Sequence, residues 1–558
     1  MVKTKEGKNM NFKGKMQRKS GITLIALTIT IIVLLILAGV AITAISRDNG
    51  ILQNAARAKE ETEQAERDEK EKLGDMEDIL NEYTTGQTVE QVTDEKAGVL
   101  EGTGTDDDPY VINSIEDLVV FASNVRKGTT YEGQTVKLGL SLDFKSNKSY
   151  VNPLRTDYGE YGYDGELKTL LTSGEGFIPI GSSSTQENNF FYGTFDGNNY
   201  DIYNLYVGLD INQNEDIILG FFAVNYGTIK NLNLKNVNID IPNVKNNITV
   251  GVGGVTAMNR NSIADCYVSG NIINKGNLYS MAGGICGVLD SEATIENCIN
   301  ESNILVENNS GPVAGGIVGQ SSANTGIINA SCNTGTIQAN GKENAEINVG
   351  GIIGYSRGEV KNCYNTGNIN GKSNKDAKIG GIVGAAEQNK NVSYCYNTGE
   401  IKSEGSTSNL NQGGIIGWNY ENSISNVFNF GNINVQVQPM DEIKKDKFKA
   451  GGIAAGTLSY TIENAYNIGD VIENIEAESI GSIVGQRWDS TLSNCNYLKG
   501  TYSKGIGILY TSSDTEEGVT ELEDISDFPD ILDVINEEGM FKEDTNNINN
   551  GYPVLNWQ

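Results

Sequence analysis

The chain of 558 residues contains no histidine. This absence excludes the Ser-His-Asp triad, His-ligated zinc and the HExxH metalloprotease site, because each of these sites needs an imidazole. The seven cysteines include no CxxC pair, which argues against a thiolate metal site and against a disulfide framework. No nucleotide, flavin or haem motif is present, so we expect no cofactor.

Positive charge is also scarce in this chain. The 42 Lys and Arg residues stand against 72 Asp and Glu residues, so the formal net charge at pH 7 is -30. Because like charges repel at long range, this balance disfavours direct binding to nucleic acid or to anionic lipid headgroups. The length corresponds to a few domains or to one long repetitive domain.

The N-terminus combines a basic leader, residues 1–21, with an uncharged apolar run at 22–45. At about 1.5 Å per residue, a helix of this length crosses a bilayer core of about 30 Å. Basic flanks stay on the cytoplasmic side of a membrane. The sequence therefore predicts a transmembrane helix at 22–45, with the bulk of the chain outside the cytoplasm.

A glycine, Gly21, stands directly before the apolar run, which begins ITLIA. This arrangement resembles the N-terminal signal of type IV prepilins, in which a dedicated peptidase cuts after the glycine and methylates the new N-terminus. The resemblance implies a processing site between Gly21 and Ile22, with the prepilin peptidase and other pilin subunits as partners. That family usually has Glu at the fifth mature position, where this chain has Ala26, and this departure favours a minor or tip subunit. A plain uncleaved signal anchor stays open as the alternative.

Two further segments precede the main body of the chain. Residues 46–83 are rich in Ala, Glu, Lys, Gln and Arg and contain no Pro, which predicts an exposed helical stalk. Residues 84–96 are polar and aperiodic, as is typical of a linker.

A Gly-Gly-apolar signature recurs at spacings of 30 to 38 residues, once with Ser in the second place. Its copies begin at Gly253, Gly283, Gly315, Gly350, Gly380, Gly413, Gly451 and Gly481. A second signature follows each copy, as in Val360, Cys363 and Ile369. Short β-branched runs with Gly and Asn at a fixed period are typical of a β-solenoid, in which equivalent residues of stacked coils form ladders. We expect the glycines to turn corners at positive φ and the asparagines to hydrogen-bond along the axis.

Most cysteines share one position of the second signature. These are Cys266, Cys298, Cys363, Cys395 and Cys495. Ser331, Val427 and Ala465 take the same place in other copies, so the position requires a small and mostly apolar side chain. Free cysteine behaves as a small hydrophobe in a core, which favours a packing ladder over a redox or metal-binding role.

The repeat resembles the GLUG motif of bacterial surface proteins, which include some adhesins and, as accessory repeats, certain immunoglobulin-cleaving metalloproteases. The resemblance spans 219–500 and implies a mainly β fold, a parallel β-solenoid similar to a right-handed β-helix, preceded by the N-terminal membrane and stalk helix. Protease activity does not carry over, because the zinc motif of those enzymes needs His. We expect capping coils at 97–218 and a C-terminal cap at 501–558, because uncovered coil ends would aggregate.

Other candidate sites each have a structural alternative. Asp106, Asp107 and Asp108 could ligate calcium, but an acidic turn is the commoner structure. Asp196 lies in a Phe-Asp-Gly turn and is interpreted as structural. One repeat position carries aromatics, for which we favour a stacked ladder over a glycan-binding platform: Tyr364, Tyr396, Phe428 and Tyr466. The longest variable segment, 434–450, should project from one edge, where repeat proteins build binding surfaces. It carries Lys444, Lys445, Lys447 and Lys449.

These features together predict a bacterial surface or pilus protein that works as an adhesin-like minor or tip pilin, without catalysis. The N-terminal helix would hold it in the cytoplasmic membrane, with the C-terminal bulk outside the cell, and its ligand would be a glycan or protein of a host or surface. Two alternatives stay open. One is a surface-tethered β-helix enzyme acting on polysaccharide, and the other is a passive structural spacer.

Overall fold

The computed structural model describes residues 100–144, 177–181, 189–208, 217–241, 250–276, 279–342, 345–388, 390–404, 409–436, 447–458, 461–474, 477–527, 533, 535–536 and 538–558. All of these lie in one compact unit, Lys96–Gln558. The predicted N-terminal segments lie outside the described residues: the leader 1–21, the membrane span 22–45, the stalk 46–83 and the linker 84–96. Across the described ranges, no helix is long and apolar enough to span a membrane.

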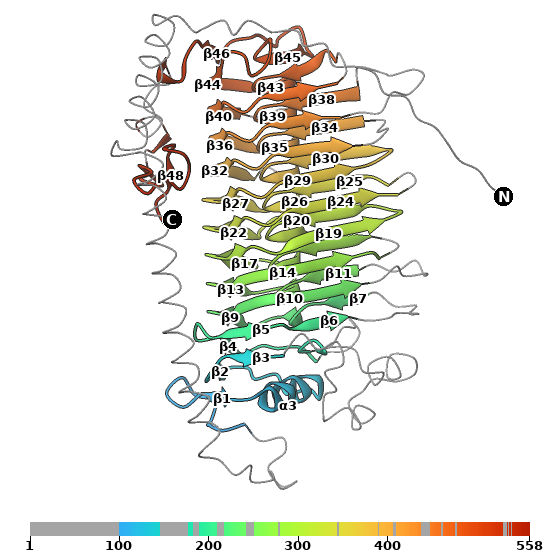
Figure 1. Cartoon of the computed structure of the whole chain (residues 1–558), viewed down its shortest axis with the longest axis vertical. Helices are drawn as coiled ribbons and strands as arrows, with labels where there is room; N and C mark the ends of the chain where they lie inside the picture. The colour runs from blue at the N-terminus through green and yellow to red at the C-terminus, as the bar shows by residue number, and fades with distance from the viewer. Residues whose placement is uncertain are drawn as a thin grey trace, which may run out of the picture. The chain divides into compact units, whose positions relative to one another are not determined.

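The described residues form a parallel β-solenoid whose coils stack along one axis (Figure 1). Each full coil contributes strands to three sheets, which we call A, B and C. The glycine pairs of successive coils lie opposite one another, as Gly350 does to Gly380 and Gly380 to Gly413. The repeat register predicted from the sequence is therefore confirmed, whereas the hand of the coil stays a prediction.

Sheets B and C are regular stacks in which each coil adds one strand. Among the described residues, sheet B consists of β8 (Phe222–Asn225), β12 (Thr256–Asn259), β16 (Cys286–Leu289), β21 (Val318–Ser321), β26 (Ile353–Ser356), β31 (Val383–Ala386), β35 (Ile416–Tyr420), β39 (Ala454–Leu458), β43 (Val484–Trp488) and β45 (Ile506–Leu509). Sheet C, in the same ranges, consists of β7 (Ile217–Leu219), β11 (Val250–Gly253), β15 (Ser280–Gly283), β20 (Pro312–Gly315), β25 (Ile347–Gly350), β30 (Asp376–Gly380), β34 (Asn409–Gly413), β38 (Phe448–Gly451) and β42 (Ser479–Gly481).

Sheet A receives more than one segment from most coils. Within the described part of the chain it consists of β1 (Tyr110–Ile112), β2 (Thr135–Leu138), β3 (Leu142–Asp143), β4 (Thr194–Asp196), β5 (Asp201–Tyr203), β6 (Tyr206–Gly208), β9 (Thr228–Lys230), β10 (Asn233–Ile241), β13 (Ser262–Ala264), β14 (Tyr267–Asn274), β17 (Thr294–Glu296), β18 (Ile299–Asn300), β19 (Asn303–Asn308), β22 (Ile327–Asn329), β23 (Cys332–Asn333), β24 (Ile337–Gly341), β27 (Glu359–Lys361), β28 (Tyr364–Asn365), β29 (Ile369–Lys372), β32 (Asn391–Asn397), β33 (Ile401–Glu404), β36 (Ser423–Asn429), β37 (Ile433–Val435), β40 (Thr461–Asn467), β41 (Val471–Glu473), β44 (Thr491–Leu498) and β46 (Val519–Leu522).

The glycine pairs do not have positive φ, so that prediction is wrong. A Cβ on Gly380 would lie 1.9 Å from the Val383 carbonyl oxygen, and a Cβ on Gly381 would lie 2.0 Å from the Gly414 carbonyl oxygen. Close approach of neighbouring backbones, and not corner geometry, therefore excludes a side chain at the pair.

Positive φ falls instead on the residue before the small ladder position. These residues are Asn231, Asp265, Asn297, Ala330, Asn362, Tyr394, Asn426, Asn464 and Asn494. Asn and Asp adopt the left-handed conformation more readily than other non-glycine residues, because their short side chains hydrogen-bond locally. This column explains why Asn recurs at that point of the repeat.

The expected asparagine ladder runs along the axis inside the solenoid. Its members are Asn300, Asn333, Asn365, Asn397, Asn429 and Asn467. In each coil the Nδ2 atom donates to the Oδ1 atom of the next asparagine, as Asn365 does to Asn397 at 2.8 Å. The same Nδ2 donates to a carbonyl oxygen two residues on, here that of Gly367 at 2.8 Å. Since the side chains are fully buried, these bonds satisfy groups that water does not reach.

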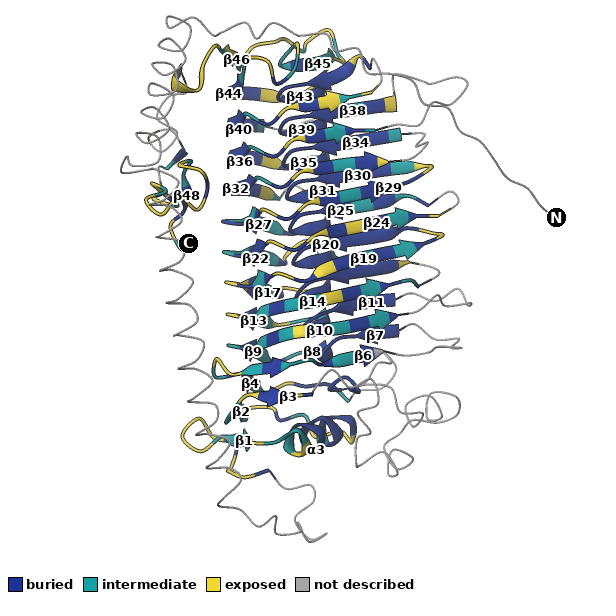
Figure 2. Ribbon diagram, viewed as in Figure 1, coloured by how far each residue is buried: buried dark blue, intermediate teal, exposed yellow. Residues whose placement is uncertain are grey.

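Apolar ladders fill the rest of the interior (Figure 2). The residue after each glycine pair, such as Ile352, Ile382 or Ile415, is fully buried in one continuous core cluster. At the N-terminal end the helix α3 (Ile115–Arg126) begins with Ser114 as N-cap, whose side chain accepts a hydrogen bond from Asp117 N. Phe121 of α3 packs against aromatic rings of the first coils, so this helix covers that end of the core.

The C-terminal residues divide between two places. Strand β45 pairs with β43, and β46 pairs with β44, so both extend the last coil. The short 3-10 helix η3 (Ile525–Asp527) follows, and β47 (Phe541–Lys542) and β48 (Val554–Leu555) then form a small antiparallel sheet. This last segment lies beside sheet A, half-way along the stack, and not over its end (Figure 1). The interaction that holds it there is apolar, as described below.

Candidate functional site

Sheets B and C carry a second apolar cluster on their outer faces, separate from the interior core. It is built from Met281 and Val313 of sheet C and Val288 of sheet B, with two partly buried neighbours, Met258 and Tyr355. These five side chains come from both sheets, so the outer faces of B and C approach one another. The surface of the solenoid is therefore concave between sheets B and C.

The side chains on these outer faces form one row along sheet B and one row along sheet C. The residue types in both rows change toward the C-terminal end. In sheet B the row continues in register from Tyr355 through Ala385 to Trp418, Gly456, Gln486 and Ile508. In sheet C it continues from Val313 through Asn348 to Lys378, Asn411, Lys449 and Ser479. Here the rows enclose an open pocket of about 300 Å³. Its lining residues are Trp418, Lys447, Lys449, Ser479, Gln486, Trp488, Ile508 and Tyr510, and we call it the aromatic–lysine pocket.

Aromatic rings form two parts of the pocket wall. The ring of Trp418 lies over Gly456 of the next coil, where a Cβ would be 2.5 Å from Trp418 Cζ3 and 3.6 Å from Lys449 Cδ. Glycine at this place therefore makes room for both the indole and the lysine stem. Further on, Trp488 and Tyr510 stack with ring centroids 4.2 Å apart and an angle of 29° between their planes. Tyr510 remains 56% exposed, so the pocket presents an accessible aromatic surface.

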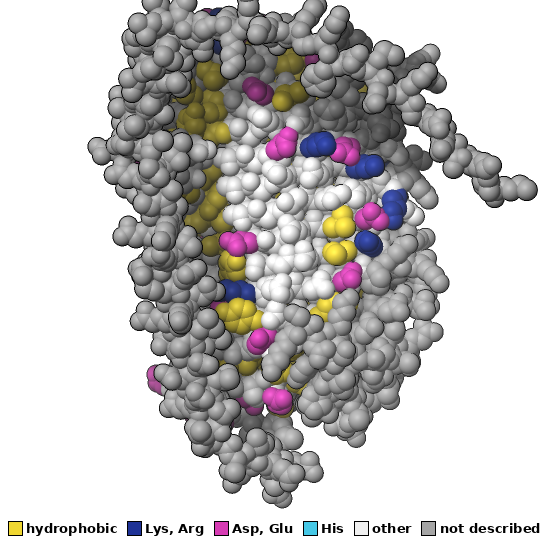
Figure 3. Space-filling model, in the orientation of Figure 1, with side chains coloured by type: hydrophobic (Ala, Val, Ile, Leu, Met, Phe, Trp, Pro, Cys, Tyr) yellow, Lys and Arg dark blue, Asp and Glu magenta, His cyan; other side chains and the backbone are white. Residues whose placement is uncertain are grey.

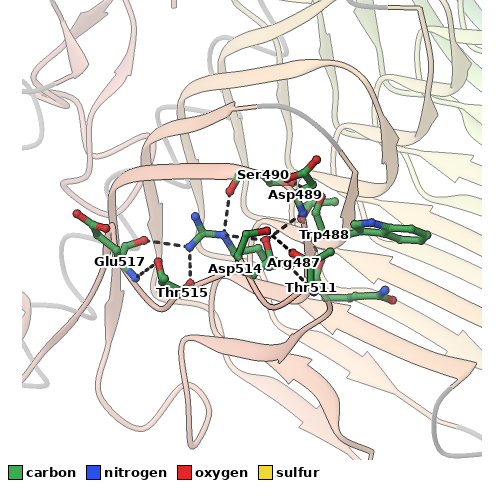
Figure 4. Close-up of polar contacts among 11 residues, drawn as sticks. Arg487, Trp488, Asp489, Ser490, Thr511, Asp514, Thr515 and Glu517 are labelled. Atoms are coloured by element: carbon green, nitrogen blue, oxygen red, sulfur yellow. Dashed lines mark hydrogen bonds and ion pairs between the residues drawn. The ribbon is translucent and has the colours of Figure 1, made fainter.

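A buried arginine fixes the loop that carries Tyr510 (Figure 4). Arg487 donates through Nε to Ser490 O at 2.9 Å, and through Nη1 to the carbonyl oxygens of Thr515 and Glu517. Its guanidinium lies 3.9 Å from the buried carboxylate of Asp514, which accepts hydrogen bonds from Asp489 N and Thr511 N. In Figure 4 the ring of Trp488 points away from this polar cluster. Arg487 and Asp514 therefore fix the loop on the side away from the pocket, and the neighbouring Trp488 lines the pocket.

The described lining residues of the pocket include two lysines, in an acidic protein. Lys447 and Lys449 line it, and no Asp or Glu is among its described lining residues. Nearby, Lys504 Nζ donates to the carbonyl oxygens of Glu478 and Gly507, at 3.0 Å and 2.6 Å. The charge of the described lining residues is thus opposite in sign to the formal net charge of -30.

A second, polar pocket of about 380 Å³ lies on the outer face of sheet A. It is lined by Gln338, Asn340, Asn370, Gly371, Lys372, Lys402 and Glu404. Lys402 pairs with Glu404 at 2.7 Å, so the opposite charges largely cancel. Figure 3 shows that the visible face is mostly uncharged, with acidic side chains scattered over it and most basic side chains toward the right of the view. This pocket offers no aromatic surface.

The five cysteines predicted to share one position do lie at equivalent places in the coils, each buried and with a free thiol. The Sγ atom of each contacts the carbonyl oxygen two residues before it, for example Cys363 Sγ to Lys361 O at 3.0 Å. Ser331 makes the same bond through its Oγ atom, to Asn329 O at 2.9 Å. This shared contact explains why serine replaces cysteine in that coil.

Burial lowers the reactivity of five cysteine thiols, three of which belong to this ladder. Desolvation raises the pKa of Cys286 and of Cys495 to about 12, and that of Cys332 to about 11. It also raises the pKa of Cys298 and Cys363 well above the usual value. Because the thiolate is the nucleophile and the metal ligand, the arrangement supports packing and not redox chemistry.

The aromatic column on sheet A is stacked, as the sequence analysis favoured. The rings of Tyr364 and Tyr396 are 5.1 Å apart, and those of Tyr396 and Phe428 are 4.8 Å apart, with nearly parallel planes. The C-terminal segment covers them, and Trp557 Nε1 donates to Asn362 O at 3.1 Å. Since Tyr396, Phe428 and Tyr466 are almost completely buried, this column is a packing surface for the chain's own C-terminus.

The remaining candidates take structural contacts or lie elsewhere. Asp106 accepts a hydrogen bond from Thr135 Oγ1 at 2.7 Å, and the described residues include no group of three or more His, Cys, Asp or Glu placed to hold a metal ion. Asp196 accepts from Asn198 N and Asn231 Nδ2, which closes the turn. The proposed processing site, Gly21 and Ile22, lies outside the described residues, as does most of the variable segment 434–450.

Comparison with known proteins fits the repeat architecture. The model of the GLUG motif matches residues 345–370, which belong to one coil. The chain is a β-solenoid protein that carries the GLUG motif. One similar solved structure is described as a "putative immunoglobulin A1 protease from Bacteroides ovatus", with 18% identity and a TM-score of 0.36 over 82% of this chain and 95% of that chain. At this level the likeness assigns neither an activity nor a substrate to the present protein. No curated protein matches the chain.

The aromatic–lysine pocket was not predicted from the sequence, although two of its lining residues, Lys447 and Lys449, belong to the variable segment 434–450. Trp418 follows its glycine pair by four residues and Trp488 follows the Gly481-Ser482 pair by six, so the two indoles do not share a repeat position. Stacking of the coils brings them to one pocket. The sequence did contain one signal for the pocket, the rarity of tryptophan. Two of only three Trp residues in the chain fall within two coils of each other.

Proposed function

We propose that this protein is a non-catalytic attachment protein of the bacterial surface, an adhesin-like solenoid that binds its ligand at the aromatic–lysine pocket. The observation that supports this proposal is the accessible stack of Trp488 and Tyr510 beside two lysines, on a rigid scaffold. Exposed aromatic surface with a few convergent polar groups is typical of binding sites.

The lining of the pocket supports binding over cleavage. Hydrolysis of a glycosidic bond usually requires two carboxyl groups placed on either side of it. The described lining residues offer aromatic, amide, hydroxyl and ammonium groups but no carboxylate. A surface-tethered polysaccharide hydrolase is therefore the weaker alternative, and a passive spacer would not need an accessible aromatic pocket.

Attachment is tested with the full-length chain in detergent micelles and with cells of the native host. We expect saturable binding to a panel of glycans and proteins without product formation, and weaker attachment of cells that carry Trp418→Ala. Release of shorter products would support the enzyme instead. A chain that neither binds nor cleaves, in cells that attach as before, would leave only the spacer.

We further propose that the N-terminal helix anchors the protein as a minor or tip subunit of a pilus-like assembly. This rests on the basic leader, Gly21 and the apolar run in the sequence. Mass analysis of the protein from sheared surface filaments and from membranes tests it. We expect a methylated N-terminus at Ile22 and material in the sheared fraction, whereas a chain that keeps Met1 and stays in the membrane would contradict pilus assembly.

A further inference from the structure

We propose that the aromatic–lysine pocket binds a carboxylated sugar unit of an acidic glycan. This inference rests on the proposed attachment function and names the class of its ligand. Three properties of the pocket lead to it: flat aromatic walls, two lysines among its lining residues, and a side-chain amide in its wall.

The aromatic walls suit the faces of sugar rings. A pyranose ring has flat faces with C–H groups, which pack on the π-face of an indole or phenol, while its hydroxyls remain at the edge. Trp418 supplies one such surface, and the stacked Trp488 and Tyr510 supply another that begins two coils further along the axis. The two surfaces come from strands β35 and β43 and from the residue after β45, so separate units of one glycan chain could use both.

The lysines select for an acidic unit. Lys447 and Lys449 line the pocket, and carboxylates bind ammonium groups through charge-assisted hydrogen bonds. The rest of the protein is acidic, but charges more than about 8 Å away are largely screened at physiological ionic strength. The local lysines therefore decide the sign of the potential that a bound sugar experiences.

Gln486 supplies a polar group for the sugar hydroxyls. The residue is 7% exposed, and it lines the pocket from the same strand as Trp488. Its amide makes no hydrogen bond to any described residue. An amide in the wall of an open pocket can donate to and accept from a ligand hydroxyl, which itself can donate and accept.

The shape of the site favours a glycan over an acidic peptide. Extended peptides usually bind by adding a strand to an exposed sheet edge. Here β35, β39 and β43 are paired on both sides by neighbouring coils, so their backbone groups are already used. Coils repeat at about 4.8 Å, close to the length of one pyranose unit. Lys378 and Tyr355 continue the same rows, so an extended glycan chain could run along the axis.

The test compares two forms of one probe on the full-length chain in detergent micelles. Oligogalacturonate carries one carboxylate on each sugar unit, and its methyl ester has the same backbone without the charge. We expect the acid to bind at least about tenfold more tightly than the ester, and its affinity to fall as NaCl is raised from about 50 mM to about 500 mM.

Matched variants assign binding to the pocket. We expect Trp418→Ala and Lys449→Gln each to weaken binding of the acid by about tenfold or more. Ala385 already occupies the equivalent position of the preceding coil, so alanine fits at position 418. Tyr279→Ala and Lys402→Gln are the controls, because Tyr279 is exposed elsewhere and Lys402 lines the polar pocket. Both controls should bind as the natural protein does.

The outcomes separate this inference from the proposed function. Equal binding of acid and ester, with no effect of Lys449→Gln, would overturn the acidic ligand but leave attachment through the pocket intact if Trp418→Ala still reduces cell attachment. Displacement of the sugar by a short poly-glutamate peptide at equal concentration would overturn the glycan in favour of a peptide. If the Trp418→Ala variant binds the acid and attaches to cells as the natural protein does, both proposals are overturned.

Discussion

Each asparagine of the buried ladder satisfies several polar groups at once. Asn397 accepts from Asn365 Nδ2 and donates to both Gly399 O and Asn429 Oδ1. A Cβ on Gly381 would lie 2.6 Å from the Cγ atom of Asn397, so the amide also determines why its neighbour is glycine. The asparagine and the glycine pair are thus two parts of one packing unit.

Replacement of one ladder asparagine should be strongly destabilising. Asn397→Ala removes three buried hydrogen bonds, and we expect it to lower the free energy of unfolding by about 3 kcal/mol. The control is Asn370→Ala on the outer face of sheet A, for which we expect less than about 0.5 kcal/mol. Urea unfolding followed by far-UV circular dichroism measures both. Equal losses in the two variants would show that the ladder adds nothing to stability.

The buried thiols predict how stability depends on pH. The pKa of Cys495 is raised to about 12 in the folded protein, against the usual value of 9.0. Below pH 9 the thiol is protonated in both states, so it causes no change there. Above pH 9 only the unfolded chain releases the proton, so folding stability falls by up to about 1.4 kcal/mol per pH unit until about pH 12.

The Cys495→Ala variant isolates this contribution. Ala465 occupies the same ladder position in the preceding coil, so alanine fits there. We expect the variant to lose less stability than the natural protein when urea unfolding at pH 8 is compared with unfolding at pH 10. An identical loss would mean that the thiol already ionises in the folded state.

At the level of whole elements, the loop after β45 depends on one buried ion pair. Asp514→Asn keeps the shape of the side chain but removes the charge that faces Arg487. Breaking a buried pair is costly because one charge is left without compensation, and we expect a loss of about 3 kcal/mol, or detachment of the loop. Detachment should separate Tyr510 from Trp488 and increase the exposure of the indole, which tryptophan fluorescence measures. Asp489→Asn is the control, since its backbone nitrogen, and not its carboxylate, contacts Asp514.

The strand register of the solenoid could be predicted from the sequence. The period fixed the strand register, because identical residues at Gly350, Gly380 and Gly413 can stack only in one way. The sequence did not show that these positions are glycine because neighbouring backbones lie too close for a Cβ. A glycine required by positive φ and a glycine required by close packing are the same residue in a sequence. It also could not place the C-terminal segment, which has no repeat. Trp557 finds its partner Asn362 through tertiary packing alone.

The pocket escaped prediction for a related reason. Repeat analysis identifies residues that share a position, whereas Trp418, Gly456 and Gln486 share a position but not a residue type. Only the stacked coils show that the glycine leaves space for the indole of the coil before it. Sites of this kind come from differences between repeats, and these are visible once the register is known.

Over the whole molecule, each coil contacts mainly the coils before and after it, so stability is close to a sum over neighbours. Removal of one complete repeat should therefore preserve the fold. Deleting residues 285–316 joins Gly284 to Ile317, which restores a glycine pair followed by an apolar residue. Val268, which now lies opposite Asn300, would then lie opposite Asn333, so the ladder would begin one coil later.

We expect this shortened protein to keep its β-sheet circular dichroism and to unfold cooperatively, with a modest fall in the thermal midpoint. Deleting residues 285–300 instead removes about half a coil. The remaining strands of that coil could then not pair in register with their neighbours in sheets A and B. That variant should be misfolded or aggregated. Because the deletion that should misfold removes fewer residues than the one that should fold, the chain length removed cannot explain the difference. If the complete-repeat deletion also fails to fold, then contacts beyond adjacent coils determine stability, and the additive description of the solenoid is wrong.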